Sequence, residues 1–144
     1  MTIRYDGKVA IITGAGGGLG RSHAIEMAKR GAKVVVNDLG GSVNGEGQNS
    51  DAAMAVVAEI EALGGEAMAH PANVANADDV ADMVEKVMAQ WGRIDILVNN
   101  AGILRDKSFT KMDLADFRTV LEVHLMGTVN CTKAVWDIMK GQEY

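Results

Sequence analysis

The chain contains few of the residues that cross-link a fold, bind zinc or enter a membrane. Its single cysteine, Cys131, excludes an intrachain disulfide and cysteine-rich zinc spacings. No apolar run reaches the roughly 18 residues that a membrane helix needs, and the first residues lack a basic and then apolar signal sequence. We therefore expect no metal site, no membrane partner and a cytoplasmic location, with Cys131 as a small buried apolar group.

Positive charge is also scarce. The chain has 14 lysines and arginines against 19 aspartates and glutamates, a net charge of −5, and its basic residues form no cluster. This balance gives no electrostatic basis for binding nucleic acid or an anionic membrane. The hydrophobic residues, 48% of the chain, are enough for the core of one domain.

Apolar segments typical of strands alternate along the chain with segments typical of helices, without repeats or low-complexity linkers. The pattern predicts strands near 8–13, 33–37, 66–70 and 94–99, and helices near 19–30, 50–63, 77–90 and 113–140. Such alternation calls for right-handed crossovers and a doubly wound parallel α/β sheet with strand order 3-2-1-4. The clearest helix has one apolar stripe, formed by Val80, Met83, Val84, Val87, Met88 and Trp91. The polar segment 40–50 is expected to be mobile without a ligand.

A glycine-rich turn, Thr13–Gly20, joins the first strand to the first helix. It fits the spacing G-x-x-x-G-x-G on Gly14, Gly18 and Gly20, whereas the fingerprint G-x-G-x-x-G fails because Leu19 stands where its last glycine belongs. No Walker lysine followed by Ser or Thr is present, which disfavours a nucleoside triphosphate cradle. Glycines let a phosphate approach the backbone, and free amides at a helix start favour a pyrophosphate. The alternative is a glycine turn with a purely structural role.

An acidic residue, Asp38, ends the second strand at the distance from the glycines that suits a ribose 2′-hydroxyl ligand. Its carboxylate would repel a 2′-phosphate, and no Arg or Lys lies in the glycine turn or directly after Asp38 to compensate. The pattern therefore favours NAD over NADP. The alternative is a solvated Asp that opens a turn before Gly40 and Gly41.

Three further segments complete a pattern that resembles the classical short-chain dehydrogenases/reductases. Asn99-Asn100-Ala101-Gly102 follows the fourth strand, Asn73-Val74 follows the third, and Val123–Gly127 reads V-H-L-M-G where most members read V-N-x-x-G. The resemblance covers essentially the whole chain and implies a Rossmann-type fold, an NAD cofactor and a small-molecule substrate. It also implies cofactor contacts, with Gly14, Gly18, Leu19 and Gly20 at the pyrophosphate, Asp38 at the adenosine ribose, Asn73 and Val74 at the adenine, and Asn99, Asn100, Ala101 and Gly102 on the nicotinamide side.

Within that family, the segments Val36–Gly41 and Asn99–Phe109 and the surroundings of His124 are similar to the (3R)-hydroxyacyl-CoA dehydrogenase domains of peroxisomal multifunctional enzymes. Bacterial stand-alone relatives share these features. The resemblance implies oxidation of a secondary alcohol, with a 3-hydroxyacyl-CoA as the expected substrate. His124 stands where most of the family has an Asn, which in the family helps a water-linked proton relay to the catalytic lysine. Two interpretations of His124 remain open, a part in that relay and simple packing on a helix.

The family's catalytic Ser, Tyr and Lys have no counterpart in this sequence. Only Tyr5 and Tyr144 are present, and neither has a lysine four positions later. We therefore expect residues 1–144 to be the N-terminal, dinucleotide-binding part of a single domain, truncated after the fourth strand and its helix and inactive by itself. Two alternatives are a non-catalytic NAD-binding or interaction module and an S-adenosylmethionine-binding fold, against which N-N-A-G and the glycine spacing argue.

Two apolar surfaces lead us to expect self-association. The fourth strand would be an under-covered edge at Ile94, Ile96, Leu97 and Val98. The last helix has more apolar residues than one sheet-facing stripe needs, namely Phe117, Leu121, Leu125, Val135, Ile138 and Met139. In the family this helix packs against its counterpart in a second subunit, so the resemblance implies a homodimer or homotetramer.

Overall fold

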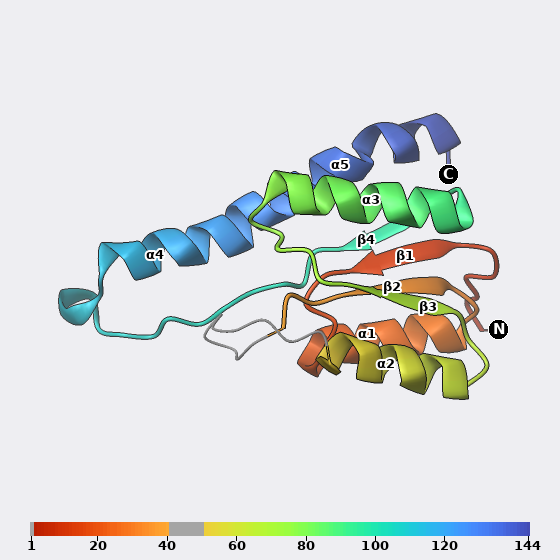
Figure 1. The fold of residues 1–144 in the computed structure, drawn as a ribbon, viewed down its shortest axis with the longest axis horizontal. Helices are drawn as coiled ribbons and strands as arrows, with labels where there is room; N and C mark the ends of the chain where they lie inside the picture. The colour runs from red at the N-terminus through yellow and green to blue at the C-terminus, as the bar shows by residue number, and fades with distance from the viewer. Residues whose placement is uncertain (1, 41–50) are drawn as a thin grey trace.

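The computed structural model describes residues 2–40 and 51–144, and its centre is a four-stranded parallel sheet (Figure 1). The strands are β1 (Val9–Ile12), β2 (Lys33–Asn37), β3 (Ala67–His70) and β4 (Ile96–Val98). Their order is β3-β2-β1-β4, which confirms the predicted doubly wound sheet. The expectation of a mobile segment at 40–50 concerns residues that, Gly40 apart, lie outside the described ones.

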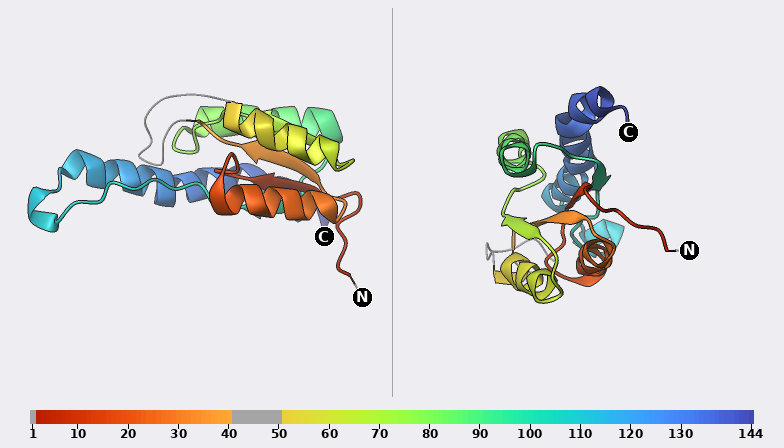
Figure 2. Two further views of the ribbon diagram at one scale, coloured as in Figure 1. Left: turned by 90° about the horizontal axis from the view of Figure 1, so that it is seen from below. Right: turned by 90° about the vertical axis from the view of Figure 1, so that its right-hand side faces the viewer.

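Helices cover both faces of the sheet (Figures 1 and 2). On one face lie α1 (Gly18–Lys29) and α2 (Asp51–Ala62), and on the other lie α3 (Ala77–Trp91) and α5 (Gly127–Gln142). Side chains alternate along each strand, so Val9 and Ile11 of β1 face α3 and α5 while Ala10 and Ile12 face α1 and α2. Because both faces are covered, the central strands are continuously apolar.

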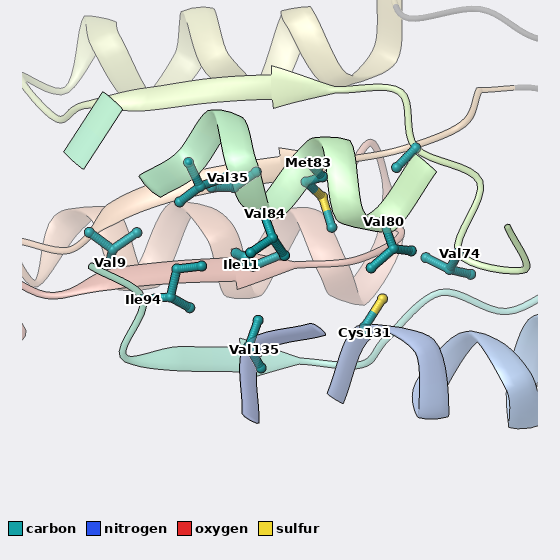
Figure 3. Packing of buried hydrophobic residues seen from close by; sticks show 12 residues of the cluster. Val9, Ile11, Val35, Val74, Val80, Met83, Val84, Ile94, Cys131 and Val135 are labelled. Carbon is teal, nitrogen blue, oxygen red and sulfur yellow. The ribbon is translucent and has the colours of Figure 1, made fainter. Parts of the chain in front are cut away.

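The core between the sheet, α3 and α5 is shown in Figure 3. The predicted stripe of α3 is confirmed, since Val80, Met83, Val84 and Val87 are buried in this core and Met88 and Trp91 pack against it. Cys131 of α5 is buried there as well, as predicted. Burial raises the pKa of its thiol to about 11, so the sulfur stays protonated and unreactive near neutral pH.

The last helix differs from the single regular helix predicted over 113–140. After a short 3-10 turn, η1 (Phe109–Lys111), the chain forms α4 (Leu114–Leu121), a π-helical turn, η2 (Glu122–Met126), and α5. A π turn takes up one extra residue, and here it accommodates two close contacts of the helix. The ring of His124 lies at Ile103, and Gly127 lies so near Val74 that a Cβ would come within 2.6 Å of Val74 Cγ2. Such turns leave little trace in apolar periodicity.

The predicted under-covered edge is wrong at Ile94, whose side chain is fully buried in the core below α3 and α5. The side-chain amide of Gln142 accepts from the backbone N–H of Ile94 and donates to its carbonyl, so the end of α5 holds this segment. Ile96, Leu97 and Val98 are half-buried at the sheet edge. On the last helix Val135 is buried and Ile138 and Met139 pack on the core, whereas Phe117, Leu121 and Leu125 are exposed.

Candidate functional site

A cavity of about 610 Å³ opens at the carboxyl ends of the strands. Its walls come from the segments that follow each of the four strands and from one side of α4 and η2. This is the edge of a doubly wound sheet at which ligands bind. The lining includes eight residues predicted from the sequence: Gly14, Gly18, Asp38, Asn73, Val74, Asn100, Ala101 and Gly102.

The glycine turn is tightly packed on one side and open on the other. Gly14 has φ +62°, and a Cβ there would lie 2.8 Å from Cα of Ala101, so the turn closes onto the segment after β4. Around Gly17 and Gly18, by contrast, there is open space where a Cβ would lie. No side chain caps the first N–H groups of α1, which begins at Gly18. These amides are therefore available to an anion in the cavity.

Asp38 lies beside this turn and uses both carboxylate oxygens. Oδ2 accepts a hydrogen bond from the backbone N–H of Gly16 at 2.8 Å, and Oδ1 accepts one from the N–H of Gly40 at 2.8 Å. A Cβ on Gly16 would lie 2.6 Å from Oδ2, so only glycine allows this approach. The carboxylate is thus held at the rim of the cavity between the turn and the end of β2.

Asn100 and Thr13 tie the ends of β1 and β4 together. The Asn100 side chain donates to the backbone carbonyls of Thr13 at 3.0 Å and Gly14 at 3.2 Å. In return, the hydroxyl oxygen of Thr13 accepts from the backbone N–H groups of Asn100 and Ala101, each at 3.0 Å. This network fixes the floor of the cavity, and Thr13 is a member that the sequence prediction missed.

The segment after β3 is held by several polar side chains. Asp79 of α3 accepts from the backbone N–H of Asn73 at 3.0 Å, and the Asn73 side chain accepts from the N–H of Ala75 at 3.0 Å. Asn130 of α5 donates to the carbonyl of Val74 at 2.9 Å. Asn73 and Val74 are therefore presented to the cavity by a rigid backbone.

His124 lies beside the segment that follows β4. Its Nε2 is 3.0 Å from both the backbone nitrogen and the carbonyl oxygen of Ile103. Its ring occupies the space that a Cβ on Gly102 would need, with Cε1 only 2.6 Å from that position. His124 thus packs against Gly102 and fixes the backbone at Ile103 by a hydrogen bond.

Three predicted residues lie outside the cavity lining. Leu19 is 73% exposed. Gly20 is buried where a Cβ would collide with the Gly14 carbonyl and the Asn100 side chain, so its role is packing of α1 on the turn. The Asn99 side chain donates to the hydroxyl of Thr132 on α5 at 3.2 Å.

The cavity also has lining residues that the sequence prediction did not include. Gly16 and Asn37 were identifiable as neighbours of predicted residues within the same motifs. Four others belong to α4 and η2: Arg118, Thr119, Glu122 and Val123. Val123 opens the V-H-L-M-G segment named above, whereas no local pattern places the other three at the site. Within residues 2–40 and 51–144, no cluster of His, Cys, Asp or Glu is arranged to hold a metal ion, and no helix is long and apolar enough to span a membrane.

Comparison with known proteins gives consistent matches. Residues 8–144 match the family described as short chain dehydrogenase. Peroxisomal multifunctional enzyme type 2 of Drosophila melanogaster is 52% identical over 142 residues, which are 99% of this chain and 23% of that protein. A 3-oxoacyl-(acyl-carrier-protein) reductase of Synechocystis sp. is 47% identical over 136 residues, covering 94% of this chain and 52% of that protein.

Solved structures agree with these matches. A 7α-hydroxysteroid dehydrogenase complexed with NADH and 7-oxo glycochenodeoxycholic acid superposes with a TM-score of 0.86 and 39% identity. The match covers 96% of this chain and 51% of that one. The chain therefore spans about half the length of the shorter relatives and less than a quarter of the Drosophila protein.

The comparisons contradict the expected cytoplasmic location. The Drosophila relative and four others, from mouse, Dictyostelium, Neurospora and yeast, are named as peroxisomal enzymes. The expectation was based on one cysteine and the lack of an apolar signal sequence. Neither feature separates the two compartments, because peroxisomal import depends on a short receptor-read address.

Proposed function

This chain belongs to the short chain dehydrogenase family, and on that premise we propose that it is the NAD-binding part of an oxidoreductase that oxidises a secondary alcohol. The observation that carries the proposal is the single cavity that gathers the ends of four strands, with uncapped glycine amides at one side and a carboxylate at its rim. Its volume of about 610 Å³ is within the range of about 300–1,000 Å³ that is usual for small-molecule sites.

The residues present fit a dinucleotide. The start of α1 has no side-chain cap and lies where Gly17 and Gly18 leave open space, so its free N–H groups, at Gly18, Leu19 and Gly20, suit a pyrophosphate. Asp38 suits the hydroxyl groups of a ribose, and its negative charge disfavours a 2′-phosphate. Asn73 and Val74 suit the adenine. On the nicotinamide side the chain offers four consecutive residues, Asn99, Asn100, Ala101 and Gly102.

The chain's own contribution to the reaction is binding and orientation. A bound nicotinamide supplies the hydride chemistry. Asn100 and Thr13 hold the floor of the cavity, and His124 holds Ile103, so hydrogen bonds fix the backbone on the side where a nicotinamide would be held. No tyrosine in residues 1–144 has a lysine four positions later. We therefore propose that these residues alone bind NAD without efficient turnover.

For the whole protein, the proposed substrate is a 3-hydroxyacyl-CoA. The support is identity near 50% to the N-terminal parts of peroxisomal multifunctional and hydratase-dehydrogenase-epimerase enzymes. A 3-oxoacyl-(acyl-carrier-protein) reductase is similar to a comparable degree. The choice of coenzyme A, rather than acyl carrier protein, as the group that carries the thioester is therefore itself part of the proposal. The alternative is a non-catalytic NAD-binding or interaction module. The relatives' names favour a peroxisomal setting for the protein.

Calorimetric titration of residues 1–144 with NAD and with NADP tests the binding proposal. We expect binding of NAD and weaker binding of NADP, and absence of heat with both would contradict it. An assay of NAD reduction with a 3-hydroxyacyl-CoA, done on residues 1–144 and on any extended chain that the gene encodes, separates the enzyme from the module. Turnover only in the extended chain supports the enzyme, and NAD binding without turnover in both supports the module.

A further inference from the structure

His70 is a buried histidine outside the cavity, at the carboxyl end of β3. Only 5% of its surface is exposed, and both ring nitrogens have partners. Nδ1 is 3.1 Å from the backbone nitrogen of Ala72, and Nε2 is 2.8 Å from Oδ2 of Asp82 on α3. The ring therefore connects the surface of α3 to the segment that follows β3.

The partners determine which nitrogen carries the proton. The backbone N–H of Ala72 can only donate, so Nδ1 must be an unprotonated acceptor. Hydrogen bonds from Lys86 and from His70 lower the pKa of Asp82, whose ionised carboxylate can only accept, so Nε2 carries the proton. The Ala72 N–H and the Asp82 carboxylate thus both require the neutral tautomer that carries its proton on Nε2.

Ala72 lines the cavity together with Asn73 and Val74, at the end that suits adenine. Its carbonyl accepts from the Asn37 side chain at 3.0 Å, and Asn37 also donates to the His70 carbonyl at 3.1 Å. The N–H of Ala72, in contrast, is held by His70 Nδ1. Without that acceptor the buried N–H would have to move toward another partner, which would displace the cavity wall.

We propose that His70 is a positioning residue for the adenosine end of the site: its unprotonated Nδ1 fixes the Ala72 backbone, and Asp82 fixes the tautomer. The proposal rests on the proposed NAD-binding function. His70, a side chain outside the cavity, would thus contribute to the affinity for the cofactor.

Two substitutions separate the two nitrogens. In His70→Asn the side-chain amide occupies the region of Nδ1 and can accept from Ala72, whereas in His70→Gln it reaches the region of Nε2 and Asp82 but leaves Ala72 without an acceptor. We expect His70→Gln to weaken NAD binding about tenfold and His70→Asn by less than about threefold. His23→Gln on α1, which removes an exposed histidine, is the matched control and should bind NAD like the unsubstituted chain.

Two further measurements do not depend on ligand. Amide exchange at Ala72 should be fast in His70→Gln and slow in His70→Asn, and nitrogen chemical shifts of His70 in the unsubstituted chain should be those of the Nε2–H tautomer. The proposal is overturned if His70→Gln binds NAD normally, if both variants lose affinity equally, or if the tautomer is Nδ1–H. If the unsubstituted chain binds no NAD, the proposed function itself fails and this role with it.

Discussion

The carboxylate of Asp38 accepts the backbone N–H of Gly16 at 2.8 Å, across 22 residues of sequence. One acidic side chain therefore stabilises the glycine turn and places a negative charge at the rim of the cavity. The charge and the Gly16 hydrogen bond can be separated, because Asn removes the charge and keeps one acceptor for Gly16 while giving up the bond from Gly40, whereas Ala removes the charge and both acceptors.

We predict that Asp38→Asn and Asp38→Ala both reduce the preference for NAD over NADP by about tenfold or more, since the repulsion of a 2′-phosphate is lost. Asp38→Ala should weaken NAD itself and lower the melting temperature more than Asp38→Asn, because Ala leaves both Gly16 and Gly40 without an acceptor, whereas Asn leaves only one of them without an acceptor. Titration with both cofactors gives the preference. An unchanged ratio of affinities in Asp38→Asn would remove the assigned role.

A second prediction concerns the space around the glycine turn. Gly16→Ala would place a Cβ 2.6 Å from Asp38 Oδ2, and the collision should destabilise the fold by about 1–3 kcal/mol. Gly17→Ala is the matched control, because Gly17 has an extended backbone with φ −167° and nothing within 4 Å of a Cβ. Urea unfolding measures the stability of both variants, and equal stability would contradict the close contact between Gly16 and Asp38.

A third prediction concerns a buried carboxylate at the opposite end of the sheet. The Asp95 side chain is fully buried and accepts from the Val9 backbone at 2.9 Å, from Arg93 at 2.6 and 2.8 Å and from Gln142 at 3.2 Å. It thereby joins the beginnings of β1 and β4 to the end of α5. Burial alone would raise its pKa, but hydrogen bonds from Arg93 and Val9 outweigh burial and hold the pKa below its ordinary value.

Because the pKa of Asp95 is lower in the folded than in the unfolded chain, its stabilisation is present above about pH 4 and is lost as the pH falls through the folded value. Asp95→Ala should cost about 2–3 kcal/mol at pH 7 and less at pH 3. Urea unfolding at both pH values measures this. The exposed Asp106→Ala should change stability by less than about 0.5 kcal/mol, and an equal loss in both variants would contradict the prediction.

The fold could be predicted because its determinants are local. Buried strands such as Lys33–Asn37, the stripe of α3 and the glycine turn each have short-range patterns, and the strand order follows from their alternation. Most cofactor-site candidates lie together for the same reason, since Gly14, Asp38 and Asn100 each follow a strand and parallel strands end at one edge.

What could not be predicted depends on contacts between distant segments. The π turn at Glu122–Met126 accommodates two contacts, His124 with Ile103 and Gly127 with Val74, that become visible only when the helix is packed on the sheet. Ile94 was expected at an open edge, but its side chain is buried in the core with residues of α3 and α5, and its backbone is held by the Gln142 side chain, 48 residues away. The requirement for glycine at position 16 likewise comes from Asp38, not from the turn itself.

The last prediction concerns self-association, which we propose from the exposed apolar side of the long helix. Phe117, Leu121, Leu125 and Trp136 are exposed on α4, η2 and α5, and α4 projects beyond the sheet (Figures 1 and 2). Apolar groups in such a row favour burial against another chain, so sedimentation velocity at micromolar concentration should show at least a dimer.

Leu125→Glu should shift the chain toward monomer by placing a charge in this row, where Leu125 is 57% exposed. Leu63→Glu is the matched control, because Leu63 is also 57% exposed but follows α2 on the opposite face of the sheet. Dissociation by the first substitution alone assigns the interface to the long helix, and equal dissociation by both assigns it elsewhere. A monodisperse monomer of the unsubstituted chain would contradict self-association altogether, and the exposed row would then have to be explained by some contact other than one between copies of this chain.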